Sequence, residues 1–161
     1  MNIKIDEENI KFKFRVAGLL IVDNKLLTVE IMNNGINCLP GGHVMIGENT
    51  KDAIIREFME ETKLNVSVKK IECIIENLFN RSNGDLVHEI QVIYSLKLND
   101  EIEVKDWQYI EVDEDFKKQL AFKWIDIDKL DCVKPIIVNK LINNYKVLHF
   151  IVNNDLIINE E

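Results

Sequence analysis

The segment from Thr50 to Lys63 constrains this chain most, because it has the spacing of one helix with two contrasting sides. At about 100° per residue, apolar side chains gather on one side and glutamates on the opposite side. The apolar side contains Ile54, Ile55 and Phe58, and the acidic side contains Glu57, Glu60 and Glu61. Asn49 or Thr50 is a suitable N-cap. The only residue of the acidic arc without a carboxylate is Ala53, which is small enough to let a ligand approach.

The acidic side of this helix is unfavourable for stability alone. Glu57 and Glu61 are a like-charged i,i+4 pair and Glu57 and Glu60 an i,i+3 pair, each costing about 0.2–0.5 kcal/mol. The helix dipole disfavours Glu60 and Glu61 by about 0.3–1 kcal/mol each. Clustered carboxylates are the ligands that Mg²⁺ prefers, so the energies favour a metal site over a solvated acidic face. Arg56 lies beside Glu60, where its planar fork could orient a carboxylate or form an ordinary surface pair.

The residues around this helix closely resemble the Nudix box, G-x5-E-x7-R-E-U-x-E-E-x-G-U, in which U is a bulky aliphatic residue. The matching positions are Gly42, Glu48, Arg56, Glu57, Glu60, Glu61 and Leu64, and Phe58 fills an apolar position. The preceding Leu39-Pro40-Gly41-Gly42 and the later Phe122-x-Trp124 extend the resemblance. It implies one Nudix domain over residues 1–161, of α+β (α/β) class, folded as a Nudix-like α/β/α sandwich with a mixed β-sheet.

The sequence departs from the family pattern at two positions near the box. Lys63 replaces the closing glycine, so the helix end lacks the residue best suited to a left-handed turn. Asn37 replaces an aromatic residue that often precedes the Leu-Pro of the loop, and this exchange is expected to change packing or ligand contacts beside the site.

The resemblance also implies an activity and a set of roles. Nudix enzymes hydrolyse a nucleoside diphosphate linked to another group, with Mg²⁺ or Mn²⁺ and a water nucleophile. The family pattern assigns metal binding to Glu57 and Glu61, with Glu60 as a further ligand or as the group that orients or deprotonates the water. Glu48 would support the metal from the loop, and Arg56 would fix a glutamate. Divalent ions can neutralise phosphate charge and lower the pKa of water.

Three further positions are candidates for contact with substrate. Glycine lets the backbone N–H groups of Gly41 and Gly42 approach a phosphate closely. His43 follows and could touch a phosphate or face solvent. Some Nudix proteins use an acid outside the box as an extra ligand or base. Glu89 is the candidate for that role, although it could equally be a carboxylate at a strand edge.

The rest of the chain has the pattern of several strands with short helices. The β-rich runs are Phe12 to Val22, Lys25 to Ile31, Asn65 to Asn77, Leu86 to Leu98 and Phe122 to Asp126. Asp23-Asn24 suits a tight hairpin turn. A loop is expected from Asn33 to Gly47, a helical turn at Ile127 to Leu130, a helix opened by Pro135 up to Asn143, and an edge strand or docked tail at Val147 to Leu156. Trp107, Phe116, Phe122 and Trp124 are expected in the core.

Charge and hydropathy exclude several classes of protein. The net charge of −8 disfavours general nucleic-acid binding and an RNA-end pyrophosphohydrolase, but allows a small phosphorylated ligand neutralised by metal. Of this charge, −5 lies between Asp100 and Lys118, which predicts a solvated connection or edge element. No apolar run approaches the ~18 residues needed to cross a membrane. The N-terminus mixes both charge signs and lacks the apolar core of a secretion signal, so we expect a cytoplasmic protein.

Two functions of different class are compatible with these patterns. The first is a Mg²⁺-dependent pyrophosphohydrolase acting on a small nucleotide, such as a modified nucleoside triphosphate, a dinucleotide or a nucleotide sugar. The second is a non-catalytic Nudix-fold module that senses or binds a nucleotide. The intact set of Arg56, Glu57, Glu60 and Glu61 favours the enzyme, whereas Lys63 and Asn37 slightly favour the binding module. A homodimer paired through Val147 to Leu156 is possible.

Overall fold

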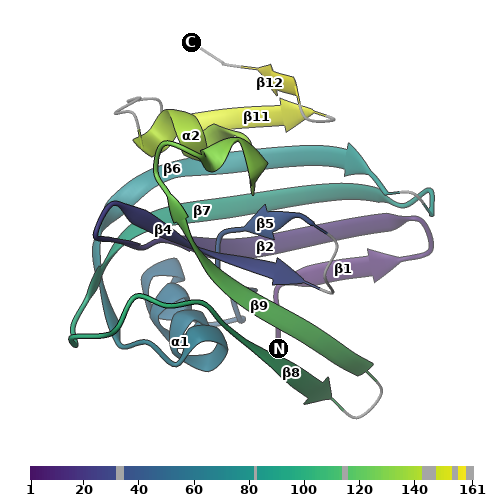
Figure 1. The fold of residues 1–161 in the computed structure, drawn as a ribbon. Helices are drawn as coiled ribbons and strands as arrows, with labels where there is room; N and C mark the ends of the chain where they lie inside the picture. Colours follow the sequence, from purple (N-terminus) through teal and green to yellow (C-terminus); the bar gives the residue numbers. More distant parts are fainter. Residues whose placement is uncertain (32–34, 82, 114–115, 143–147, 154–155, 159–161) are drawn as a thin grey trace.

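Within the residues that it describes, the computed structural model contains two β-sheets and two α-helices, shown in Figure 1. It describes residues 1–31, 35–81, 83–113, 116–142, 148–153 and 156–158. The positions predicted at Asn33, Asn143 and Val147 lie outside these residues, as does the side chain of Phe116. Both sheets combine parallel and antiparallel pairing, so the α+β class and the mixed pairing are confirmed, although the strands form two sheets rather than one.

The first sheet carries the longest strands. Its order is β1-β2-β7-β6-β11-β12, formed by Lys4–Glu7, Ile10–Leu19, Leu86–Leu98, Val66–Asn80, His149–Asn153 and Leu156–Ile158. The β2–β7 and β11–β6 pairs are parallel, and the other pairs are antiparallel. The C-terminal segment thus adds two strands to this sheet, and β12 is its edge.

The second sheet crosses the first and has the order β10-β5-β4-β9-β8, with β3 paired to β4. Its strands are β3 Ile21–Val22, β4 Lys25–Ile31, β5 Asn37–Cys38, β8 Trp107–Asp113, β9 Phe116–Asp126 and β10 Val133–Lys134. The predicted edge element within the acidic segment is confirmed, because β8 lies at the edge of this sheet.

The run predicted as one strand from Phe12 to Val22 is divided between the two sheets. β2 ends at Leu19 and β3 begins at Ile21, with the buried Leu20 between them. The apolar stretch from Val16 to Val22 continues through the change of sheet, so the sequence pattern does not reveal the crossing. The predicted hairpin turn is confirmed: Asp23 and Asn24 have φ of 49° and 58°, the left-handed values of a type I′ turn.

Helix α1 spans Thr50–Thr62, and the side chain of Asn49 caps it by accepting a hydrogen bond from Asp52 N. Ile54 and Phe58 are fully buried, as predicted. Ile55 and Met59, in contrast, are 36% and 43% exposed, and Ala53 is buried in the core rather than left open for a ligand. The inward side is therefore rotated from the predicted one, and it includes the half-buried Glu57 and Glu61.

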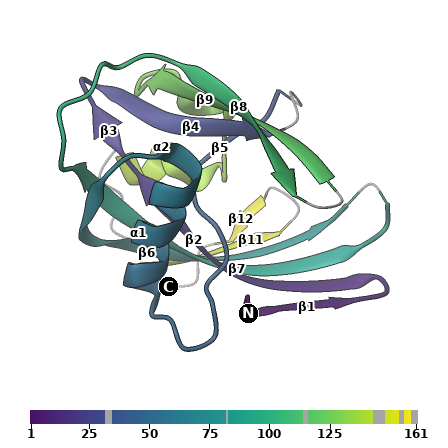
Figure 2. The same ribbon diagram turned by 90° about the horizontal axis from the view of Figure 1, so that it is seen from below.

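The core has two parts, one on each side of the first sheet. In the first, helix α1 lies against the first sheet (Figure 2), and its Phe58 belongs to the same cluster as the aromatic residues of β8 and β9. Phe122 and Trp124 are buried there, as predicted, and the half-buried Trp107 stacks on Phe122 with 4.7 Å between ring centroids. The second part includes helix α2 and the inner side of β11.

The C-terminal helical segments differ slightly from the predicted ones. Helix α2 spans Ile137–Ile142, and the Pro135 carbonyl accepts a hydrogen bond from Val138 N at its start. The helical turn predicted at Ile127 to Leu130 is instead a 3₁₀ turn at Leu130–Cys132, because Ile127 N bonds to Asn24 O and holds that segment against the β3–β4 turn. No described helix is long and apolar enough to span a membrane.

Lys63 adopts the conformation that a glycine would favour. Its φ is 62°, and its N–H bonds to Met59 O, so the helix ends in a left-handed cap despite the missing glycine. This conformation costs an L-residue about 1–2 kcal/mol. We expect Lys63→Gly to raise the free energy of unfolding by about 0.5–1 kcal/mol in urea titrations, after the entropy of the unfolded chain is counted. Lys63→Ala, which keeps the Cβ, is the matched control and should not stabilise; equal gains from both variants would contradict this explanation.

Candidate active site

The glycine loop, residues 39–47, precedes α1. It lies along β2 and is held there by backbone hydrogen bonds. Gly18 N and Val16 N donate to Pro40 O and Gly42 O at 3.0 and 2.9 Å, and Val44 N donates to Phe14 O. Gly41 has φ of 152°, and a Cβ there would overlap the Val16 backbone. Only glycine allows this approach, so the loop enters the site through its backbone.

Gly42 provides the surface on which the Glu57 carboxylate rests. A Cβ at Gly42 would overlap that carboxylate. Glu57 Oε1 accepts a hydrogen bond from Arg56 Nη1 at 2.7 Å, and its side chain is 14% exposed. One predicted metal ligand is thus fixed between the glycine loop and Arg56.

Arg56 joins the loop to the helix through five hydrogen bonds. Its Nε and Nη2 donate to the two oxygens of Glu48, each at 2.8 Å. Nη1 also reaches Glu60 Oε2 at 3.1 Å, in addition to Glu57, and Nη2 donates to His43 O at 3.1 Å. The predicted orienting role of Arg56 has a geometric basis here, because one planar guanidinium contacts three glutamates.

The side chain of Glu61 is held by Gly41 of the loop. Gly41 N donates to Glu61 Oε2 at 3.2 Å, and the Tyr109 hydroxyl donates to Glu61 O at 2.7 Å. Tyr109 thereby ties strand β8 to the end of α1, a contact that the sequence pattern did not predict. Glu57 and Glu61 both lie on the inward side of the helix and both contact the glycine loop.

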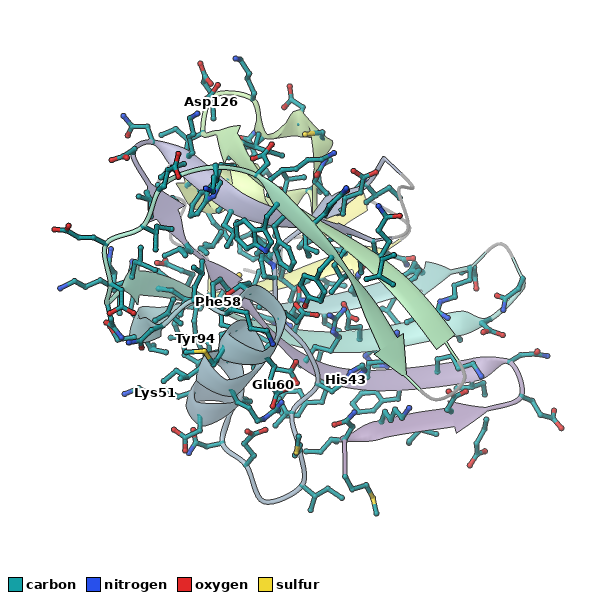
Figure 3. All side chains as sticks on the ribbon, turned by 60° about the horizontal axis from the view of Figure 1, so that its bottom comes forward. His43, Lys51, Phe58, Glu60, Tyr94 and Asp126 are labelled. Atoms are coloured by element: carbon teal, nitrogen blue, oxygen red, sulfur yellow. The ribbon has the colours of Figure 1, made fainter. Side chains whose placement is uncertain are left out.

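Glu60 lies at the open edge of the site, whereas His43 is partly buried. The Glu60 side chain is 58% exposed, whereas Phe58, on the other side of α1, points into the core (Figure 3). In the same view His43 lies on the loop next to the helix position of Glu60. The exposed glutamate therefore borders solvent, while the other box carboxylates are enclosed.

The pairing of Arg56 with Glu48 shifts the pKa of both side chains. Hydrogen bonds from Arg56 lower the pKa of Glu48 below its ordinary value of 4.5, and Met45 N adds a further bond at 3.1 Å. The carboxylates of Glu48 and Glu57 in turn raise the pKa of Arg56. Both groups therefore stay charged at neutral pH.

This shift predicts how stability depends on pH. A carboxyl group with a lowered folded-state pKa stabilises the fold above its unfolded value, and this contribution is lost as pH falls through the folded value. We expect Glu48→Gln to lower the free energy of unfolding by about 1–2 kcal/mol at neutral pH, and the difference from wild type to shrink as pH falls below 4.5. A difference that stays constant in urea titrations from about pH 7 to pH 3 would contradict it.

Glu89 pairs with an arginine of the neighbouring strand β2. It is buried on β7, and its Oε2 is 3.5 Å from Arg15 Nη1. Arg15 also donates from Nη2 to Gly41 O at 3.2 Å. Arg15 was not a candidate from the sequence, because it continues the alternation of Lys11 and Lys13 along β2 and so resembles an ordinary polar position of a strand.

The donor set can be compared with the needs of a divalent cation. Four carboxylates at one helix and loop, with backbone groups of Gly41 and Gly42 beside them, are hard oxygen donors of the kind that Mg²⁺ and Mn²⁺ take. Among the described residues, no three acidic, imidazole or thiol side chains are grouped closely enough to hold an ion as they stand. The residues fit by chemistry, and in this arrangement Arg56 and the loop occupy their oxygens.

Comparison with known proteins agrees with this site. A NUDIX domain model matches residues 12–143. An ADP-ribose pyrophosphatase of Methanocaldococcus jannaschii is 34% identical over 84 residues, which are 50% of this chain and 48% of that protein. The chain thus matches about half the length of this curated relative.

Solved structures share the fold at low identity. A mutator MutT protein of Bacillus halodurans superposes with a TM-score of 0.60 at 14% identity, covering 91% of this chain and 95% of that chain. A NUDIX hydrolase of Nitrosomonas europaea gives 0.54 at 22% identity, covering 84% and 91%. An ADP-ribose pyrophosphatase of Streptococcus suis gives 0.51 at 18% identity, covering 84% and 95%. With the family model spanning most of the sequence and the box residues assembled around Arg56, the chain belongs to the NUDIX domain family.

Proposed function

We propose that this protein is a Mg²⁺-dependent pyrophosphohydrolase, with Mn²⁺ as a possible substitute. It cleaves the phosphoanhydride bond of a nucleoside diphosphate linked to another group. The observation that carries the proposal is the cluster of Glu48, Glu57 and Glu60 on one arginine, next to glycines that admit a ligand to the backbone. The 34% sequence identity to an ADP-ribose pyrophosphatase over 84 residues makes ADP-ribose the first substrate to test.

The reaction adds water across one P–O–P bond. The water oxygen bonds to one phosphorus, the bridging oxygen leaves with the other, and ADP-ribose would yield AMP and ribose 5-phosphate. A bound divalent cation would supply charge neutralisation at the phosphate oxygens and a lowered pKa for the attacking water. Glu57, Glu61 and Glu60 would hold the cation, with Glu48 supporting the site from the loop.

The remaining roles follow from position. Glu60 is the most exposed of the box carboxylates, which suits a group that orients the attacking water or takes its proton. Arg56 would keep Glu57 turned toward Gly42. Gly41, Gly42 and His43 would line the phosphate side, because their backbone forms the part of the loop that contacts the glutamates and Arg56. Glu89 is linked to this loop through Arg15.

We also propose that residues 1–161 form one domain. The segments outside the family match pair directly with strands inside it: β1 with β2, and β11 with β6. The ends of the described chain therefore extend the first sheet.

A substrate panel tests the proposed activity. Purified protein is incubated with Mg²⁺ and with ADP-ribose, other nucleoside diphosphate sugars, dinucleotides and nucleoside triphosphates, and products are separated by chromatography. We expect one class to give two phosphorylated products, with loss of turnover in EDTA. Glu76→Gln serves as the control variant, because the Glu76 carboxylate pairs with His88 and His149 of the first sheet. Absence of turnover with either metal, together with tight nucleotide binding by calorimetry, would replace the enzyme with the binding module.

A further inference from the structure

Arg15 lies between a buried carboxylate and the glycine loop. Its Nη1 is 3.5 Å from Glu89 Oε2, and its Nη2 donates to Gly41 O at 3.2 Å. Gly41 N in turn donates to Glu61 Oε2 at 3.2 Å. The N–H of Gly41 thus donates to a proposed metal ligand, Glu61, and the carbonyl oxygen of Gly41 accepts from Arg15.

The surroundings of Arg15 favour a fixed guanidinium. Its side chain is 27% exposed and that of Glu89 is 10% exposed. A β-bridge to His43 holds the Arg15 backbone against the loop. A partly buried guanidinium needs a counter-charge, and Glu89 provides it on the neighbouring strand. Arg15 Nε is itself buried without a hydrogen-bond partner in the described structure, and Glu89 is the carboxylate that pairs with this guanidinium.

We propose that Arg15 is a positioning residue for the glycine loop and that Glu89 acts through Arg15, not as a base or a metal ligand. This inference rests on the proposed function. Because the peptide between Gly41 and Gly42 is planar and trans, fixing Gly41 O on Arg15 also turns the Gly42 N–H away from Arg15. Arg15 therefore sets the orientation of the Gly41–Gly42 peptide. Glu57 rests on Gly42, and Gly41 donates to Glu61.

A double-mutant cycle separates this role from an independent one. We expect Arg15→Ala to lower kcat/KM about 30- to 100-fold, since small misplacements in an active site can cost about 10²-fold. Glu89→Gln should cost about 10-fold, and the double variant should match Arg15→Ala, because Glu89 has no role once Arg15 is gone. Arg15→Lys should recover part of the loss. A double variant in which the two single effects multiply, to about 300- to 1000-fold, would overturn the proposal.

Two further measurements keep the result independent of folding and of the enzymatic assay. The pH dependence of kcat in Glu89→Gln should keep both wild-type limbs, whereas loss of the acidic limb, along which kcat rises as a base loses its proton, would identify Glu89 as the base. In two-dimensional amide NMR spectra without substrate, the Gly41 and Gly42 resonances should move in Arg15→Ala and Glu89→Gln but not in Glu76→Gln. Unchanged glycine resonances in Arg15→Ala would overturn the positioning role even if no substrate were turned over, while shifted resonances without any turnover would contradict only the proposed function.

Discussion

Glu57→Gln is expected to lower kcat at least about 10³-fold with little change in the free energy of unfolding. The amide keeps an oxygen that can accept from Arg56 Nη1, so the contact across the site survives. It lacks the negative charge that a hard divalent cation requires. Glu61→Gln should behave in the same way, because its oxygen can still accept from Gly41 N.

The measurement is steady-state kinetics over a Mg²⁺ titration, with Mn²⁺ binding followed separately by EPR. Both variants should bind Mn²⁺ more weakly than wild type. Glu60→Gln provides the contrast: if Glu60 takes the proton of the water, its kcat falls while Mn²⁺ affinity is largely kept. The control, Glu76→Gln, removes a carboxylate that contacts His88 on the first sheet and should leave both quantities unchanged. If Glu57→Gln kept the Mn²⁺ affinity and the kcat of the wild type, Glu57 would not be a metal ligand.

The sequence was most informative where chemistry demands fixed spacing. The position of Arg56 beside Glu60 predicted an arginine that orients a carboxylate, and in the structure Arg56 contacts Glu48, Glu57 and Glu60. Local signals were equally reliable: Asn49 caps the helix and Asp23-Asn24 forms the hairpin turn, because each depends on the conformational preferences of one or two residues.

Features that depend on distant neighbours could not be predicted from the sequence. A helical wheel orders the side chains of α1 but does not say which arc meets the sheet, so Ile55 was predicted buried and is exposed. Thr62 is buried instead, and its hydroxyl bonds to Phe58 O, which satisfies its polar group within the helix. The contact of Arg15 with Glu89 arises from the parallel pairing of β2 with β7, which no local pattern specifies.

Gly42→Ala is expected to lower kcat/KM about 10²- to 10³-fold while the fold persists. The added Cβ would overlap the Glu57 carboxylate, which is the end of a flexible side chain and can move away. Displacement separates Glu57 from its position between Gly42 and Arg56, so the metal site loses a preorganised ligand. Thermal unfolding and circular dichroism should remain close to wild type, and Mn²⁺ binding by EPR should weaken.

Gly41→Ala supplies the matched comparison, because its Cβ would meet the Val16 backbone at a positive φ, where nothing flexible can yield. That variant should lose about 2–4 kcal/mol of stability. The two adjacent glycines therefore predict opposite outcomes: a folded protein with a weakened site for Gly42 and an unstable protein for Gly41. Combining Gly42→Ala with Glu57→Gln should add little to the loss from Glu57→Gln alone, because both changes act on the same carboxylate. Full activity of Gly42→Ala would mean that contact between Glu57 and the loop is not needed for hydrolysis.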